Sequence, residues 1–544
     1  MAVLSRLPLL VVLMLFASAA MLIPAGYALV LHQHHIARAF LHSGLIFLIL
    51  GGMVGLAVSA NPAGSQARGT LMAMLGAVTI LPLMMAVPFA ESLPDTGLLN
   101  AWWEMVSCLT TTGATLYAAD LLAAPLHLWR AMVGWMGGLF ILVSAIAILA
   151  PLRVGGFEII SSPYVRHGQF ERLATPGPAP EARRPHLVQP GQGVALPDPT
   201  QRLIRSAGRV LPVYGGLTLV LWVVLMMLGD PALVALCRAM GTLSTSGIAP
   251  VAGPAGQFSG VGGEVVIFLF LIPALSRRFW PGGGELKATE QLRDDPELRL
   301  GLTIVALVAL VLFGRHFLGA IEVGTAAPGV SGGLLAPLRD AAAAAWGGLF
   351  NALSYLTTTG WSSVDWQGAR SWSGFSSPGL LLAGLAIMGG GVATTAGGVK
   401  LLRVYALARH GERELERMIH PHSIAGGGRM ARRLRREGAY LAFIFFMLFA
   451  VSIAVTVALV SIHRIEFESA TILSIAALTN TGQLAGTIPL TPSFQGSAGI
   501  AGAPWDGWAG LPDFTKAVLA ATMIVGRLET LAILALFSPD FWRR

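Results

Sequence analysis

Length, composition and charge place this chain among membrane proteins. Its 544 residues are 54% hydrophobic and only 12% charged, whereas a soluble protein carries about a quarter charged residues. The net charge of +8 lies between apolar segments, so it does not indicate a nucleic-acid partner, and the two cysteines form no CxxC or Cys/His set, which argues against a disulfide framework or a zinc site.

Ten apolar segments are long enough to cross a bilayer, which takes about 20 residues of helix. The first, 8–32, begins like a secretory signal, but its apolar run is too long for one, and we expect a retained transmembrane helix. The others, in chain order, are 42–60, 69–90, 126–151, 208–229, 261–280, 300–321, 376–399, 438–462 and 514–538.

Four further apolar segments are too short to cross a membrane. Segments of about 10–14 residues are better interpreted as re-entrant helices, and the irregular backbone that follows them needs protein or a water-filled path around it. We therefore predict that each segment dips into the membrane and returns to the outer side. These segments are 98–110, 231–243, 345–356 and 467–478.

The basic residues indicate the orientation of the chain. Lysine and arginine concentrate in 153–209, 277–299 and 400–436, whereas 92–129 contains neither. Because basic loops remain on the cytoplasmic side, this alternation predicts a cytoplasmic N-terminus. Basic patches that bind nucleic acid or lipid headgroups are the alternative explanation.

A five-residue motif ends each short segment. The copies are LTTTG at Leu109–Gly113, LSTSG at Leu243–Gly247, LTTTG at Leu356–Gly360 and LTNTG at Leu478–Gly482. Each copy lies between an incoming and an outgoing long span, so the sequence predicts four tandem helix, pore-loop, helix units around a pseudo-fourfold axis. The copies differ at several positions, so the arrangement should be only roughly fourfold.

These units predict the domain boundaries of an all-α polytopic protein. The Pro/Gly-rich and basic stretches between units have the composition of linkers. The expected order is an N-terminal helix pair at 1–66, pore repeat 1 at 67–160, a cytoplasmic linker at 161–204, repeat 2 at 205–290, repeat 3 at 291–410, a basic linker at 411–436 and repeat 4 at 437–544.

The four turns together predict a site for a monovalent cation. A ring of carbonyl and hydroxyl oxygens can replace the water shell of such an ion; glycine permits the necessary backbone angles, and the C-terminal ends of the short helices favour positive charge. The motifs contain no Asp or Glu, which a divalent-ion site would use. The predicted filter residues are Thr111, Thr112, Gly113, Thr245, Ser246, Gly247, Thr358, Thr359, Gly360, Asn480, Thr481 and Gly482.

Five stretches outside the motifs are characteristic of one transporter family: GWMGGLFILVSAIAIL, LRDDPELRL, MGGGVATTAGGVKLLRV, GERELERMIHP and VGRLETLAILALFSPDFW. With the four filter turns and the leading helix pair, they resemble the TrkH-type pore subunits of the Trk/Ktr/HKT superfamily of potassium transporters. The resemblance covers nearly the whole chain.

The resemblance implies K+ uptake across a bacterial inner membrane by a homodimer. It also implies regulation by a cytoplasmic ring of nucleotide-binding subunits of the TrkA (RCK/KTN) type. In the plant branch, a serine in the first filter accompanies Na+ permeation; Gly113 stands at that position here, which favours K+. We therefore expect the chain to bind the transported K+ and to contact membrane lipid. We expect neither a covalently bound cofactor nor a nucleic-acid partner.

A glycine-rich stretch and one arginine complete the predicted site. GGGVATTAGGVK, at Gly389–Lys400, interrupts an apolar span, and glycine weakens a helix by up to about 1 kcal/mol per residue. The resemblance implies an intramembrane gate loop here, with Arg527 beneath the filter; the alternatives are close helix packing through small residues and an arginine bonded to carbonyls. The predicted gate residues are Gly389, Gly390, Gly391, Thr394, Thr395, Gly397, Gly398, Lys400 and Arg527.

Two other functions remain open at this point. A membrane enzyme acting on lipid or sugar carriers would need paired acids, a histidine or a nucleophile at membrane depth, and the sequence shows no such set and no Walker motif; we therefore expect no enzymatic activity. Within transport, Na+ or NH4+ is the main rival to K+, because selectivity also depends on filter geometry. A channel and an ion-coupled symporter would carry the same motif.

Overall fold

The computed structural model describes residues 8–59, 66–94, 96–150, 156–157, 199–282, 292–324, 335–366, 378–420, 436–487 and 507–528. All regular secondary structure in these ranges is helical, which confirms the predicted all-α class. Seven segments within them are long and apolar enough to cross a membrane. They are Leu9–Val30, His34–Val58, Met72–Ser92, Ala124–Leu149, Thr200–Met227, Pro296–Gly314 and Gly438–Ser461.

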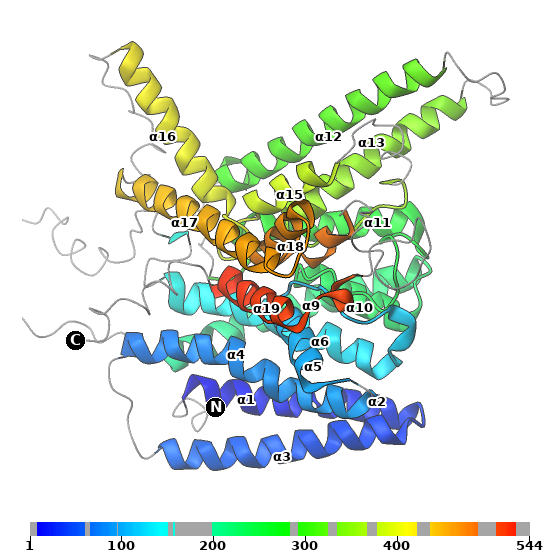
Figure 1. Cartoon of the computed structure of the whole chain (residues 1–544), viewed down its shortest axis with the longest axis vertical. Coiled ribbons are helices and arrows are strands. Elements are labelled where there is room, and N and C mark those ends of the chain that lie inside the picture. Colours follow the sequence, from blue (N-terminus) through cyan, green and yellow to red (C-terminus); the bar gives the residue numbers. More distant parts are fainter. Residues whose placement is uncertain are drawn as a thin grey trace, which may run out of the picture.

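The N-terminal helices form a layer at one end of the long axis of the molecule (Figure 1). The predicted first span consists of two consecutive helices that meet at Met21, and the next helix begins at His34 rather than at residue 42. Leu45, Ile46 and Ile49 are exposed on it, as suits a face toward lipid. These helices are α1 (Leu9–Ala20), α2 (Leu22–Val30) and α3 (His34–Ser59).

The first two units share one plan, in which a long helix leads to a short buried helix and an outgoing helix follows. The short helices match the predicted re-entrant segments closely. The first unit contains α4 (Gln66–Ser92), α5 (Leu98–Leu109) and α6 (Ala124–Ser144), which a π-helical turn extends to Leu149. The second contains α9 (Pro199–Met227), α10 (Ala232–Leu243) and α11 (Gly260–Leu271).

The third unit departs most from the prediction. The sequence predicts its short helix at 345–356, whereas the helix begins at Leu335; residues 341–344 of the added part are alanines, which have a high helix propensity. The first two helices pack together and extend away from the body of the molecule (Figure 1). The unit contains α12 (Pro296–Gly324), α13 (Leu335–Leu356), α15 (Pro378–Met388) and α16 (Leu401–Ile419).

The span predicted at 376–399 is wrong as a continuous helix. α15 ends at Met388, and the glycine-rich segment that follows is not helical, because Gly389 and Gly398 have φ angles of 72° and 76°. α16 then continues to Ile419, so the segment 411–436 begins as helix. Residues 421–435 and 161–198 of the two predicted linkers lie outside the described residues.

The fourth unit brings the last short helix to the middle of the molecule, where α18, α19, α10 and α5 lie (Figure 1). α19 packs against both α18 and α5, so the fourth unit contacts the first. The end of the span predicted at 514–538 falls beyond the described residues. The unit contains α17 (Arg436–Ser461), α18 (Phe467–Thr479) and α19 (Asp513–Leu528).

Candidate functional site: a ring of four turns

The four motif turns share one backbone outlier. The third residue of each has a left-handed conformation, with φ between 53° and 58°. A β-branched residue rarely adopts this conformation, so its recurrence at the same motif position shows that the four turns are structural repeats. These residues are Thr111, Thr245, Thr358 and Asn480.

Each turn is bonded to the end of its own short helix. The backbone N–H of the fourth motif residue donates to a helix carbonyl five residues earlier, at 2.9 Å in every copy. In the first turn, Thr112 donates to Ser107. Because the last carbonyls of a helix lack intrahelical partners, this bond joins the helix to the turn and fixes their relative orientation.

The hydroxyl groups of the turns bond behind the backbone. Thr110 donates from Oγ1 to the carbonyl of Val106, and the equivalent bonds in the four copies measure 2.7–2.9 Å. The hydroxyl of Thr112 in turn shares a hydrogen bond with that of Thr110, and the equivalent distances are 2.8–3.2 Å. The hydroxyls of Thr112, Ser246, Thr359 and Thr481 are therefore held by hydrogen bonds within their own turns.

The four turns follow one another around the ring in chain order, and each motif glycine lies very near the next turn. A Cβ at Gly113 would overlap the carbonyl oxygen of Ser246, and one at Gly247 would overlap that of Thr359. A Cβ at Gly360 would lie 2.7 Å from the Cβ of Gln483 in the fourth turn. The glycines of the motif are thus required by packing as well as by their backbone angles.

The fourth turn closes the ring in a different way from the other three. The motif glycines of the first three turns have positive φ and donate their N–H groups to carbonyls of their own preceding helices, whereas Gly482 donates its N–H to the carbonyl of Thr112 at 2.7 Å. The Asn480 amide also donates to Thr112 Oγ1 at 3.0 Å and to the carbonyl of Met523 at 2.9 Å. The four turns are therefore not equivalent around the ring.

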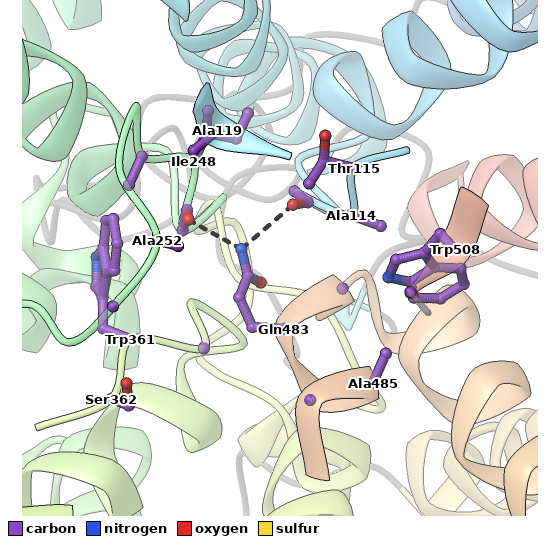
Figure 2. Close-up of a pocket in the computed structure, with 18 of the residues that line it drawn as sticks. Ala114, Thr115, Ala119, Ile248, Ala252, Trp361, Ser362, Gln483, Ala485 and Trp508 are labelled. Carbon is purple, nitrogen blue, oxygen red and sulfur yellow. Dashed lines mark hydrogen bonds between the residues drawn. The ribbon is translucent and has the colours of Figure 1, made fainter. Parts of the chain in front are cut away.

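A cavity of about 580 Å³ lies on one side of the ring. Its lining includes residues that follow all four motifs, among them Trp361 and Trp508, which flank it in Figure 2. Trp361 is buried and donates from its indole N–H to Thr242 Oγ1 at 3.2 Å, which links the third turn to α10. The cavity gives an approach to the ring that is shared by the four repeats.

Buried charged residues hold the loops that form this cavity, and they are not among the residues predicted from the sequence. Glu104 forms an ion pair with Arg130 at 2.7 Å and accepts the N–H of Leu116 at 2.9 Å.

Two other buried charged groups act in the same way. Glu264 accepts the N–H of Val364 at 2.6 Å. In the second repeat, Arg238 pairs with Asp230 and donates to the carbonyl of Pro254. The sequence feature that points to these residues is a charged side chain within an otherwise apolar segment.

The glycine-rich segment 389–400 lies against the opposite side of the ring. The N–H of Gly397 donates to Thr358 Oγ1 at 2.7 Å, and Thr395 Oγ1 donates to the carbonyl of Leu243 at 3.2 Å. A Cβ at Gly397 would overlap the carbonyl oxygen of Thr479. The segment therefore touches three of the four repeats at their turns.

Other predicted gate residues fix the shape of this segment. Gly391 donates its N–H to the carbonyl of Ala274 at 2.9 Å, and Thr394 Oγ1 donates to the carbonyl of Gly391 at 2.7 Å. A Cβ at Gly390 would crowd that same Ala274 carbonyl. Lys400 is buried, has a φ of 85°, and contacts the Ala396 carbonyl through Nζ.

Two charged residues from other helices contact the segment. Glu297, at the start of α12, accepts the N–H of Val392 at 2.9 Å. Arg527, near the end of the described part of α19, donates from Nη1 to the carbonyl of Thr395 at 2.8 Å. The structure thus brings Arg527 together with the glycine-rich segment. It also places Glu297, which is not among the predicted gate residues, against the same segment.

Comparison with known proteins gives consistent similarities. A family model described as TrkH, cation transport protein, matches residues 298–544. The Trk system potassium uptake proteins TrkH of Salmonella typhimurium and of Escherichia coli K12 are each 26% identical over 542 residues, which is 98% of this chain and 97% of the relative. The TrkI protein of Halomonas elongata is 27% identical over 84% of this chain and 81% of its own length.

A solved structure has the same fold. The crystal structure of the potassium transporter TrkH from Vibrio parahaemolyticus aligns with a TM-score of 0.71, covers 100% of both chains and is 23% identical in sequence. The helical architecture described above is therefore shared over the full length of the chain.

Proposed function

We propose that this chain, whose resemblance to TrkH-type subunits of the Trk/Ktr/HKT superfamily is confirmed by its relatives and its fold, takes up potassium ions across a bacterial inner membrane. The observation that carries the proposal is the ring of four turns, each with a left-handed third residue and each at the C-terminal end of one of the helices α5, α10, α13 and α18. A helix C-terminus carries partial negative charge, so four of them directed at one ring favour a cation.

The chemistry of the ring suits a monovalent ion. Its motifs contain no carboxylate, so a cation would be bound by backbone carbonyl and hydroxyl oxygens. All four motifs retain glycine at the fifth position, and we take this as the reason for K+ rather than Na+. The relatives named above are potassium uptake proteins, which supports the same ion.

The glycine-rich segment and Arg527 would act as the gate. The segment lies directly against the ring and touches three repeats, so an ion that passes the ring next meets this segment. Arg527 is buried and bonded to it. A buried positive charge at this position opposes the passage of cations, and movement of the segment would change that barrier.

The assembly follows from the resemblance. We propose a homodimer in the inner membrane with a cytoplasmic N-terminus and a TrkA-type (RCK/KTN) regulatory subunit on the cytoplasmic side. The basic segments 277–299 and 400–436 lie on that same side under the orientation inferred from charge. Co-purification of the chain with a TrkA-type subunit, and the mass of the detergent-solubilised complex, test these two partners.

Ion flux into proteoliposomes tests the function itself. Vesicles that contain the purified chain should take up 86Rb+, K+ should compete with this uptake, and Na+ should compete far less. Vesicles with Gly247→Val, whose Cβ would overlap the Thr359 carbonyl, should not take up the isotope. Equal uptake by wild type and this variant, or none by either, would contradict the proposal, and equal competition by Na+ would favour the rival ion.

A further inference from the structure

One side chain crosses the mouth of the ring on the side of the cavity. Gln483 follows the fourth motif glycine, and its amide Nε2 donates to the carbonyl oxygens of Gly247 at 2.9 Å, Ser246 at 3.2 Å and Gly113 at 3.4 Å. Figure 2 shows this side chain extending into the cavity between the first and second repeats. The amide therefore reaches from the fourth turn to the carbonyls of two other turns.

The position is particular to the fourth repeat. The residues that follow the other three motif glycines are Ala114, Ile248 and Trp361, none of which carries an amide. The Gln483 side chain also lies beside the glycines of the other three turns: a Cβ at Gly113, Gly247 or Gly360 would come within 2.8, 2.7 and 2.7 Å of one of its atoms, respectively. It thus lies over the mouth of the ring and not along one wall.

The amide N–H groups point at oxygens that an entering ion would need. A cation that loses water at the mouth is stabilised by carbonyl oxygens, and a carbonyl that already accepts a hydrogen bond is a poorer ligand for it. The positive end of the amide dipole and a cation are both attracted to the lone pairs of these oxygens.

The contacts of the amide allow it to move. Its Oε1 is buried without a hydrogen-bond partner among the described residues, so the donor side alone holds the group in place. Cα and Cβ belong to the fourth turn, but the amide group extends into the cavity. Rotation of the side chain would therefore break hydrogen bonds without displacing the backbone of the ring.

We propose that the Gln483 amide competes with the entering cation for the carbonyls of Gly113, Ser246 and Gly247, and thereby sets the apparent affinity for the transported ion. The inference rests on the proposed function. A cation entering from the cavity displaces the amide, and the hydrogen bonds lost at that step raise the concentration of ion needed for half-maximal uptake. The amide acts as a tethered substitute for the ion at the mouth of the ring.

The test compares the concentration dependence of 86Rb+ uptake in proteoliposomes for four variants. Gln483→Met keeps the length of the side chain and removes the donor; KM should fall roughly fivefold, as the net value of about one hydrogen bond implies. Gln483→Glu, which also cannot donate when ionised, should lower KM in the same direction. Gln483→Lys places a permanent cation at the mouth and should raise KM or abolish uptake. Gln257→Met makes the matched substitution at an exposed glutamine outside the cavity and should leave KM unchanged.

The outcomes separate this inference from the function on which it rests. A lower KM for both Gln483→Met and Gln483→Glu supports the proposal. An unchanged or higher KM for both variants, with normal wild-type uptake, overturns the inference alone and assigns Gln483 a purely structural role. An absence of wild-type uptake overturns the proposed function and the inference with it. The melting temperature of each variant in detergent, compared with wild type, identifies a KM change that comes from misfolding.

Discussion

Arg527 donates from Nη1 to the carbonyl oxygen of Thr395 at 2.8 Å, which joins the last described helix to the glycine-rich segment under the ring. Its Nε and Nη2 are buried without hydrogen-bond partners among the described residues. One donor thus fixes the segment, and the rest of the guanidinium keeps its charge without a bonded counter-ion there. Both the hydrogen bond and the charge can therefore contribute to a gate, and substitutions can separate them.

Substitution of Arg527 should raise basal ion flux through loss of its charge. We expect about tenfold more 86Rb+ uptake for Arg527→Ala, because a unit charge at a distance on the order of 10 Å contributes roughly 1.5 kcal/mol at an effective dielectric constant of about 20. Arg527→Gln, which keeps a donor for Thr395 but no charge, should behave like Arg527→Ala. Arg527→Lys should stay near wild type. Unchanged uptake in both neutral variants, per folded protein, would assign Arg527 a structural role only.

Gly113→Ser should reduce the preference for K+ over Na+. The new Cβ would overlap the Ser246 carbonyl at a φ of 72°. Left-handed strain at a residue other than glycine costs about 1–2 kcal/mol, so the ring must deform, and we expect the K+/Na+ flux ratio to fall at least about fivefold. Gly97→Ser, at the other end of the same short helix, meets nothing within 4 Å and serves as the control. Equal flux ratios for Gly113→Ser and wild type would remove the argument from the motif glycines.

The sequence was informative about the repeats because their signal is local. LTTTG, LSTSG, LTTTG and LTNTG each follow a short apolar segment of the sequence, and the structure places α5, α10 and α18 within one or two residues of the predicted segments. The interruption after Met388 could also be anticipated from its glycines. The extension of α13 back to Leu335 is not predicted, because the first half of this helix contains Arg339, Asp340 and an alanine run and so lacks a strongly apolar segment.

Contacts across the ring could not be predicted from one repeat at a time. Gln483 was unremarkable in the sequence, and its importance depends on the carbonyls of Ser246 and Gly247, more than 200 residues away in the chain. The bond from Gly482 to Thr112 likewise depends on how the fourth turn meets the first. Composition identifies which segments form the ring, whereas the side chains that cross it are determined by the closed tertiary arrangement.

The buried pair of Glu104 and Arg130 should matter for stability more than for conduction. Both side chains are almost fully buried, at 0% and 4% exposure. Glu104→Gln leaves Arg130 without a charged partner and should lower the free energy of unfolding by about 3–5 kcal/mol. The double variant Glu104→Gln/Arg130→Met removes both charges, keeps an acceptor for the Leu116 N–H, and should recover most of that loss. Denaturant unfolding in detergent measures both; equal losses in the single and double variants would show that the ion pair is not the cause.

Glu297 should hold the glycine-rich segment in place, so its substitution should open the path beyond the ring. Its Oε1 accepts the Val392 N–H at 2.9 Å. Glu297→Ala leaves that buried N–H without its acceptor, which costs about 1–3 kcal/mol, and a local cost of about 1.4 kcal/mol corresponds to a tenfold shift toward a displaced segment. We therefore expect basal 86Rb+ uptake to rise roughly tenfold, with the free energy of unfolding reduced by the same amount. Glu297→Gln retains an acceptor oxygen at the same position and should remain close to wild type in both measurements. If the two variants behaved alike, the hydrogen bond to Val392 would not be what holds the segment, and if Glu297→Ala lost stability without gaining flux, the segment would not be the barrier to ions.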